Sequence, residues 1–166
     1  MDHNHQQLIE EFYAAFAAHE PETMASCYHP EAHFTDPIFG TLQGRDIADM
    51  WRMLLERSKG QLNISFSNIT ADHIEGKANW IASYVLSSTR RKIENHISSR
   101  FIFRDGLIAD QKDTFDFYSW NRQAFGFKGW LLGKTTFMQD RVRQQAISSL
   151  RKWQSKKRNA ERNNGN

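Results

Sequence analysis

The spacing of apolar residues changes near residue 62, and this change limits the folds open to the chain. Before it, apolar side chains recur at helical spacing, first in Leu8, Ile9, Phe12, Tyr13, Phe16, Met24 and Tyr28 and then in Ile47, Met50, Trp51, Leu54 and Leu55. From Leu62 to Phe117 the period is two, with many Ile, Val, Phe, Tyr and Thr residues. Helices followed by an antiparallel meander indicate an α+β fold.

The same pattern predicts the individual elements. One helix bends at His19-Glu20-Pro21 into a second short helix, and a third runs from about Asp46 to Arg57. A short strand at His33-Phe34-Thr35 stops at Asp36-Pro37, because proline disfavours a helix before it and cannot donate to a ladder. A tight hairpin is expected at Arg104-Asp105-Gly106. The four strands of the meander are expected near Leu62–Ile69, Lys77–Leu86, Lys92–Arg104 and Leu107–Phe117.

The C-terminal part is expected to end in a helix that packs on the same domain. Three glycines predict a loop around Trp130: Gly126, Gly129 and Gly133. Thr136 and Gln139 are spaced as a capping box, and an apolar stripe follows in Met138, Val142, Ile147, Leu150 and Trp153. We therefore divide the chain into a domain with its following loop (1–133), an amphipathic helix (134–158) and a disordered tail (159–166).

Charge and composition exclude several classes of protein. The isoelectric point near 9.1 comes from the end of the chain, since residues 141–166 carry eight Lys or Arg against one Glu. The last helix must bury its apolar stripe, and no aromatic residue follows Trp153, so nucleic-acid binding is not expected. The absence of a long apolar run and a polar N-terminus indicate a soluble, cytoplasmic protein without a membrane partner.

Metal and thiol chemistry are also not expected. Cys27 is the single cysteine, which excludes a disulfide framework and a thiolate zinc site, and it reads as a small buried hydrophobe. His29 and His33 are four residues apart with Pro30 between them, and no third metal ligand is evident in the sequence. No organic cofactor is expected either.

Two aspartates are the candidate catalytic residues. Asp36 lies in Phe34-Thr35-Asp36-Pro37, and Asp113 begins Asp113-Thr114-Phe115-Asp116. An ionised carboxylate beside apolar residues is costly unless a partner neutralises it or the protein uses it. Alternatives stay open at this point, because Asp36 can be a turn residue that binds nearby backbone amides, and Asp113 can pair with a base such as Arg100.

Three segments, in their order and spacing, resemble one known superfamily. They are Phe12-Tyr13-Ala14-Ala15-Phe16, then Phe34-Thr35-Asp36-Pro37, then Phe101-Ile102-Phe103-Arg104-Asp105-Gly106-Leu107-Ile108 leading to Asp113. The chain from about Leu8 to Phe117 resembles the nuclear transport factor 2-like superfamily, the cone-shaped, cystatin-like α+β fold of ketosteroid isomerases and SnoaL-like polyketide cyclases. The resemblance implies N-terminal helices packed on a curved antiparallel sheet, here with an extra C-terminal helix.

The resemblance also implies roles for single residues. Asp36 falls where ketosteroid isomerases have their general base, and Asp113 falls near an acidic acid/base residue of the SnoaL-like cyclases. The oxyanion-binding tyrosine would fall at Phe12, beside Tyr13, and the protonated aspartate at Ser99. Steroid isomerisation is therefore not expected, since a base needs stabilisation of the enolate. The cyclases' histidine would also fall near Ser99.

The implied function is binding of a small hydrophobic molecule in an apolar pocket. Its wall is expected to contain Phe12, Tyr13, Trp51, Trp80, Tyr84, Ser99, Phe101, Gln111 and Phe115. With Asp36 and Asp113 as acid and base, the protein would be an isomerase, cyclase or hydrolase. The alternative is a non-catalytic ligand-binding or dimerisation module of the same fold. Apolar residues on both faces of the strand at 77–86 predict a homodimer through the outer face of the sheet.

Overall fold

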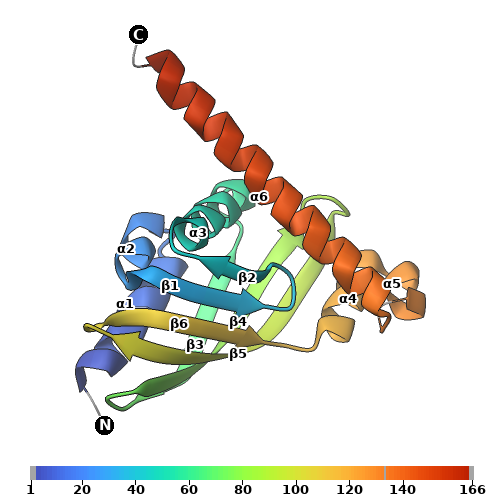
Figure 1. The fold of residues 1–166 in the computed structure, drawn as a ribbon. Coiled ribbons are helices and arrows are strands. Elements are labelled where there is room, and N and C mark those ends of the chain that lie inside the picture. The colour runs from blue at the N-terminus through green and yellow to red at the C-terminus, as the bar shows by residue number, and fades with distance from the viewer. Residues whose placement is uncertain (1–2, 133, 165–166) are drawn as a thin grey trace.

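A curved six-stranded sheet with helices packed on it forms the body of the protein (Figure 1). The computed structural model describes residues 3–132 and 134–164. The C-terminal helix crosses the molecule obliquely, and its far end projects beyond the body. In chain order the elements are α1 (His3–Ala17), α2 (Pro21–Ser26), β1 (Tyr28–Asp36), β2 (Gly40–Gln43), α3 (Arg45–Ser58), β3 (Asn63–Ala71), β4 (Glu75–Leu86), β5 (Arg91–Arg104), β6 (Leu107–Thr114), α4 (Phe117–Phe125), α5 (Phe127–Leu132) and α6 (Thr136–Asn164).

The order of strands in the sheet places the two candidate aspartates on neighbouring strands. The order is β2-β1-β6-β5-β4-β3, with β1 parallel to β6 and the other pairs antiparallel. The register between β1 and β6 ends where Thr35 lies opposite Lys112, and Asp36 and Asp113 are the next residues on these two strands. Asp113 in turn lies opposite Ser99 of β5. Three neighbouring strands thus carry polar residues at one level.

Alternation along the long strand β5 separates the two faces of the sheet. Every second residue is buried against the helices: Ile93, Asn95, Ile97, Ser99, Phe101 and Phe103. The residues between them are exposed on the outer face, among them His96 and Arg100. This period of two is the one read from the sequence, and the hairpin at Asp105 and Gly106 is also confirmed, because both residues have positive φ.

The N-terminal helices and α3 form as the apolar spacing predicts. Pro21 begins α2, where its missing N–H costs nothing. Gly44 precedes α3 with φ of 50°, and a Cβ there would lie 2.9 Å from the carbonyl oxygen of Pro30. Only glycine fits this entry to the helix. The apolar face of α3 is buried through Ile47, Met50, Trp51, Met53 and Leu55.

The sheet is larger than the predicted four-stranded meander. Tyr28 was read as helical but begins β1, and Gly40–Gln43 form the edge strand β2, which the sequence did not predict. In β2 only Leu42 is buried, so four residues with one apolar position carry no periodic signal. Because β1 joins β6 in parallel, the sheet is mixed.

The expected loop around Trp130 is wrong, since two helices form there. Asp116 caps α4 by accepting a hydrogen bond from the backbone N–H of Ser119 at 3.0 Å. A Cβ on Gly129 would lie 2.0 Å from the carbonyl oxygen of Asn121, so this glycine permits α5 to pack closely on α4. Gly133 lies outside the described residues.

Helix α6 differs from the prediction at both ends. Its first turn is capped by Thr135, whose Oγ1 accepts a hydrogen bond from the N–H of Met138, and not by Thr136. The helix continues to Asn164, so the described part of the expected tail is helical. Leu150 is fully buried and Trp153 is half-buried. Within the described residues, no helix is long and apolar enough to cross a membrane.

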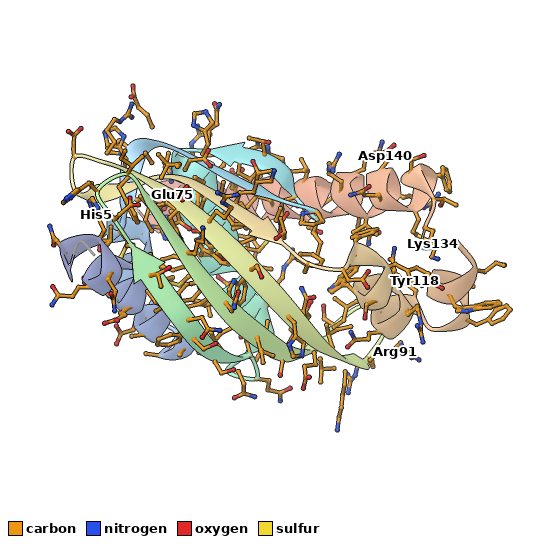
Figure 2. The ribbon with its side chains drawn as sticks, turned by 90° about the horizontal axis from the view of Figure 1, so that it is seen from below. His5, Glu75, Arg91, Tyr118, Lys134 and Asp140 are labelled. Carbon is orange, nitrogen blue, oxygen red and sulfur yellow. The ribbon has the colours of Figure 1, made fainter. Side chains whose placement is uncertain are left out.

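Apart from Phe66 and Ile74, the exposed large apolar side chains of the described residues lie on two surfaces. The outer face of the sheet exposes Val85 and Ile102 by 40% and 42%. A larger group lies away from the sheet, on α5 and the start of α6, at one end of the molecule: Phe127, Trp130, Leu131 and Phe137. Figure 2 shows Tyr118, Lys134 and Asp140 at this end, and Glu75 at the opposite end of the sheet. The predicted homodimer stays a prediction.

Candidate functional site

A cavity of about 400 Å³ lies between the inner face of the sheet and the helices α3, α4 and α6. This volume is within the range of small-molecule sites. Most of its wall is apolar, with Phe16, Phe34 and Leu54 among the lining residues, and both Asp36 and Asp113 border it. Exposed residues such as Gln61 and Ser88 border it on the side that opens to solvent.

Asp113 presents one of its two carboxyl oxygens to hydrogen-bond donors. Its side chain is 4% exposed on β6, and Oδ1 accepts from Ser99 Oγ at 2.5 Å and from Gln111 Nε2 at 3.0 Å. Among the described residues, none donates a hydrogen bond to Oδ2. When Asp113 holds a proton, that proton therefore belongs on Oδ2, because Oδ1 is already occupied by two donors.

A chain of buried groups determines the direction of these bonds. Ser99 Oγ accepts from Tyr13 Oη at 2.7 Å and from Trp80 Nε1 at 2.9 Å, which leaves its own proton for Asp113. On the other side, Tyr28 Oη donates to Gln111 Oε1 at 2.5 Å and accepts from the indole of Trp51. Gln111 thus turns its amide N–H towards Asp113, and the carboxyl group is held in a single orientation.

Burial is the main cause of the raised pKa of Asp113. It raises the pKa of this carboxyl to about 7, against the opposing effect of the hydrogen bonds from Ser99 and Gln111, while the charge of Asp36 raises it further. Burial also raises the pKa of Tyr13 and Tyr28 well above the ordinary value of a phenol. Both phenols therefore stay neutral and act as donors.

Asp36 combines a structural bond with a position on the cavity. Its Oδ1 accepts from the backbone N–H groups of Ile38 at 3.0 Å and Phe39 at 2.5 Å, as in the turn that the sequence offered as the alternative. Burial raises the pKa of Asp36 to about 6, although these backbone bonds and the charge of Arg143 on α6 oppose the rise. Two neighbouring carboxyl groups thus titrate close to neutral pH.

Comparison with known proteins gives the family. The family model of the SnoaL-like domain matches residues 9–111, which is more than half of the chain. The chain belongs to the SnoaL-like family. No match was found among curated protein sequences.

Solved structures agree with this SnoaL-like, nuclear transport factor 2-like fold. An LEH-like epoxide hydrolase of M. tuberculosis is 20% identical with a TM-score of 0.58, over 78% of this chain and 91% of that one. TsrD from Streptomyces laurentii is 22% identical with a TM-score of 0.60, over 76% and 99%. TerC, co-crystallised with polyporic acid, is 15% identical with a TM-score of 0.63, over 73% and 98%. At these identities the likeness establishes the fold alone.

The structure divides the expected pocket wall of this SnoaL-like protein into two groups. Trp51, Trp80, Tyr84 and Phe115 line the cavity. The other five expected wall residues do not line it and are at most 1% exposed behind it: Phe12, Tyr13, Ser99, Phe101 and Gln111. They lie behind it because α1 packs directly on the sheet, where the Phe12 ring contacts those of Tyr28 and Trp51. Tyr13, Ser99 and Gln111 reach the site through hydrogen bonds.

Other lining residues were missed in the sequence. Trp120 and Phe125 of α4 and Val142 of α6 close one side of the cavity. No helix was predicted at Trp120 and Phe125, and the helix that contains Val142 was expected to pack on the domain but not to line the pocket. Asn95 also lines it. Its position was readable, because a polar residue between Ile93 and Ile97 faces inward when β5 alternates.

Two further observations concern thiol and metal chemistry. Cys27 is buried, and burial raises the pKa of its thiol to about 12, so it is not a nucleophile at neutral pH. Within the described part of the chain, no group of three or more His, Cys, Asp or Glu residues is arranged to hold a metal ion.

Proposed function

We propose that this SnoaL-like protein is an enzyme that moves protons on a small, largely apolar molecule, with Asp36 as base and Asp113 as acid. The observation that supports the proposal is the pair of carboxyl groups on neighbouring strands, both with raised pKa and both bordering one apolar cavity. Isomerisation, cyclisation and hydrolysis all need a base and an acid of this kind.

The environments of the two aspartates give them different roles. With a pKa of about 6, Asp36 is mostly ionised at neutral pH and can accept a proton from a carbon atom or from water. Asp113, with a pKa of about 7, keeps a proton on Oδ2 in a large fraction of molecules and can give it to an oxygen of the substrate. One proton is taken and one is given, so the net charge is unchanged. Transfer of a proton from Asp36 back to Asp113 then restores the starting protonation state.

The alternative function is binding without turnover. It is favoured by the two backbone hydrogen bonds to Asp36, which are also what a purely structural turn residue makes. In this case the cavity would hold an apolar ligand, and the raised pKa of Asp113 would be a cost of burial and have no catalytic use.

Titration of the carboxyl groups by NMR tests the proposal. We expect two aspartates to titrate above pH 5.5, and we expect Asp36→Asn to lower the pKa of Asp113, because the charge of Asp36 raises it. Asp116→Asn is the matched control, since this carboxylate caps α4 and asparagine is an equally good cap. Titration of both aspartates near 4 would contradict the proposal.

Turnover separates the two functions. Diol formation from an apolar epoxide and solvent deuterium uptake into a cyclic ketone are followed by mass spectrometry. If the protein is an enzyme, Asp113→Asn and Asp36→Asn should each reduce the rate of these reactions by on the order of a hundredfold or more. Asp116→Asn should leave the rate unchanged. Equal rates in wild type and both variants favour the binding module.

A further inference from the structure

Two uncharged polar side chains, Asn95 and Tyr84, line the cavity apart from the Asp113 network. Asn95 on β5 lies opposite Ala82, and Tyr84 on β4 lies opposite Ile93. They are therefore diagonal neighbours on the inner face of the sheet, at most about 8 Å apart between their backbones. Side chains at this spacing can bind the same atom of a ligand.

The amide of Asn95 lacks a partner. Its side chain is 9% exposed, yet it makes no hydrogen bond to the residues that the structure describes. Native proteins nearly always satisfy polar groups in such a place with protein, water or ligand. Asn95 borders the cavity, so its N–H and C=O groups are available to whatever occupies that space.

The hydroxyl of Tyr84 has a proton to donate. Its oxygen accepts a hydrogen bond from Trp120 Nε1 at 2.9 Å, and none of the described residues accepts its proton. Burial raises the pKa of this phenol, against the opposing bond from Trp120, and the charge of Asp36 raises it further, so the group is neutral at physiological pH. A hydroxyl that accepts a hydrogen bond is polarised into a stronger donor.

Distance along the strand separates Asn95 from the level of Asp113, whereas Tyr84 lies close enough to Asp36 for that charge to act on its phenol. Asp113 lies opposite Ser99, and Asn95 is four residues farther along β5, which corresponds to about 13 Å of strand. The wall between the two levels is apolar, with Ile97, Trp80 and Ala82 lining it. A ligand that reaches both levels must be long, apolar in the middle and polar at both ends.

We propose that Asn95 and Tyr84 form a second polar subsite, which binds an oxygen of the ligand while the reacting end lies at Asp36 and Asp113. The ligand class is an elongated, largely apolar molecule with an oxygen function at each end. This inference rests on the proposed function, since it takes the carboxylate end as the other binding point. It adds that Asn95 and Tyr84 determine how long the ligand must be and which chemical group it carries at the end away from the carboxylates.

A pair of rigid probes tests the subsite. Biphenyl-4,4′-diol carries a hydroxyl at each end, and 4-phenylphenol carries one, with the same apolar body. By isothermal titration calorimetry we expect the diol to bind about tenfold more tightly, the effect of one additional hydrogen bond. Tyr84→Phe and Asn95→Leu should each remove most of this difference and leave the affinity for 4-phenylphenol nearly unchanged.

Tyr118→Phe is the matched control. It removes the same phenolic oxygen from α4, where the hydroxyl donates to the carbonyl oxygen of Trp130 and the ring lies beside Lys134, away from the cavity lining (Figure 2). The preference for the diol should persist in this variant. Near-UV circular dichroism checks that each variant is folded, and two independent variants keep the test decisive if one of them is not.

The outcomes separate the subsite from the proposed function. Equal affinity of the wild type for both probes, or a diol preference that persists in both folded variants, overturns the subsite and leaves the carboxylate end intact. Failure of both probes to bind the wild type overturns the cavity as a ligand site, and the proposed function with it.

Discussion

A carboxyl group buried as deeply as that of Asp113 couples proton binding to folding. In the unfolded chain this group has its ordinary pKa of 3.8, and burial raises it to about 7 in the folded protein. Between these two values the folded state binds more protons than the unfolded state. The free energy of unfolding must therefore fall as the pH rises through this range. Asp36 adds a slope of the same sign up to its pKa of about 6.

Asp113→Asn should remove the larger part of this pH dependence. The amide keeps an oxygen for Ser99 and Gln111 and places its NH₂ where the protonated Oδ2 would be. We expect similar stability of variant and wild type near pH 4, and a variant more stable by about 2–4 kcal/mol at pH 8. Urea unfolding between pH 4 and 8 measures this difference. An unchanged slope in the variant, or the same change in Asp116→Asn, would contradict the burial of Asp113.

At the scale of elements, α6 is held on the body by its apolar face, in which Leu150 is fully buried and Ile147 and Trp153 are partly buried, and by a group of polar bonds. Near Leu150, Gln154 donates to Asp46 Oδ1 at 2.9 Å and Asp49 Oδ2 at 2.8 Å on α3. Arg151 also donates to Asp46 Oδ1, and this salt bridge lowers the pKa of the Asp46 carboxyl. Because α6 also lines the cavity through Val142 and Ala146, its attachment matters for ligand binding.

Leu150→Ala should therefore destabilise the protein by about 2–5 kcal/mol, the range for a fully buried leucine. Trp153→Ala should cost less, since Trp153 is half-buried and its indole donates to Glu56 at the surface. Lys152→Ala is the control, because Lys152 lies two residues after Leu150 on the same helix and is exposed. This change should have little effect on stability. Thermal unfolding measures all three. Equal and negligible effects of Leu150→Ala and Lys152→Ala would mean that α6 does not pack on the body.

The elements also show where sequence reasoning succeeds and fails. Strand β5 was predictable because alternation over fourteen residues leaves one consistent register. The placement of Asp36 and Asp113 on neighbouring strands was not, since it depends on β1 and β6 joining in parallel across the sheet. Gly129 was misread as a turn residue because its close approach to the carbonyl of Asn121 is a tertiary contact. The two carboxylates could be recognised as candidates from their apolar neighbours in the sequence. The position of Trp120 and Val142 on the cavity depends on tertiary structure and could not be read from the sequence.

At the scale of the whole molecule, two exposed apolar surfaces are candidates for contact with a second copy. Helices cover only the inner face of the sheet, and the outer face mixes exposed apolar side chains with charged ones: Val85, Ile102, Lys77, Glu94 and Arg100. The apolar group on α5 and the start of α6 is more exposed, and Lys128, Lys134 and Arg141 occur among its residues. In a two-fold interface this group would meet itself, and its positive charges would repel.

We predict a homodimer through the outer face of the sheet. The substitution Ile102→Glu should disrupt this dimer. A carboxylate at Ile102 would lie opposite Glu75 of β4 in the same protomer, so an interface over this position would bury two like charges. Phe137→Glu, which changes an apolar residue on the start of α6 that is even more exposed than Ile102, is the control and should leave the dimer intact. Sedimentation equilibrium over a hundredfold range of concentration measures the association. A wild type that is monomeric at every concentration would reject the dimer, and dissociation by Phe137→Glu alone would move the interface to α5 and α6.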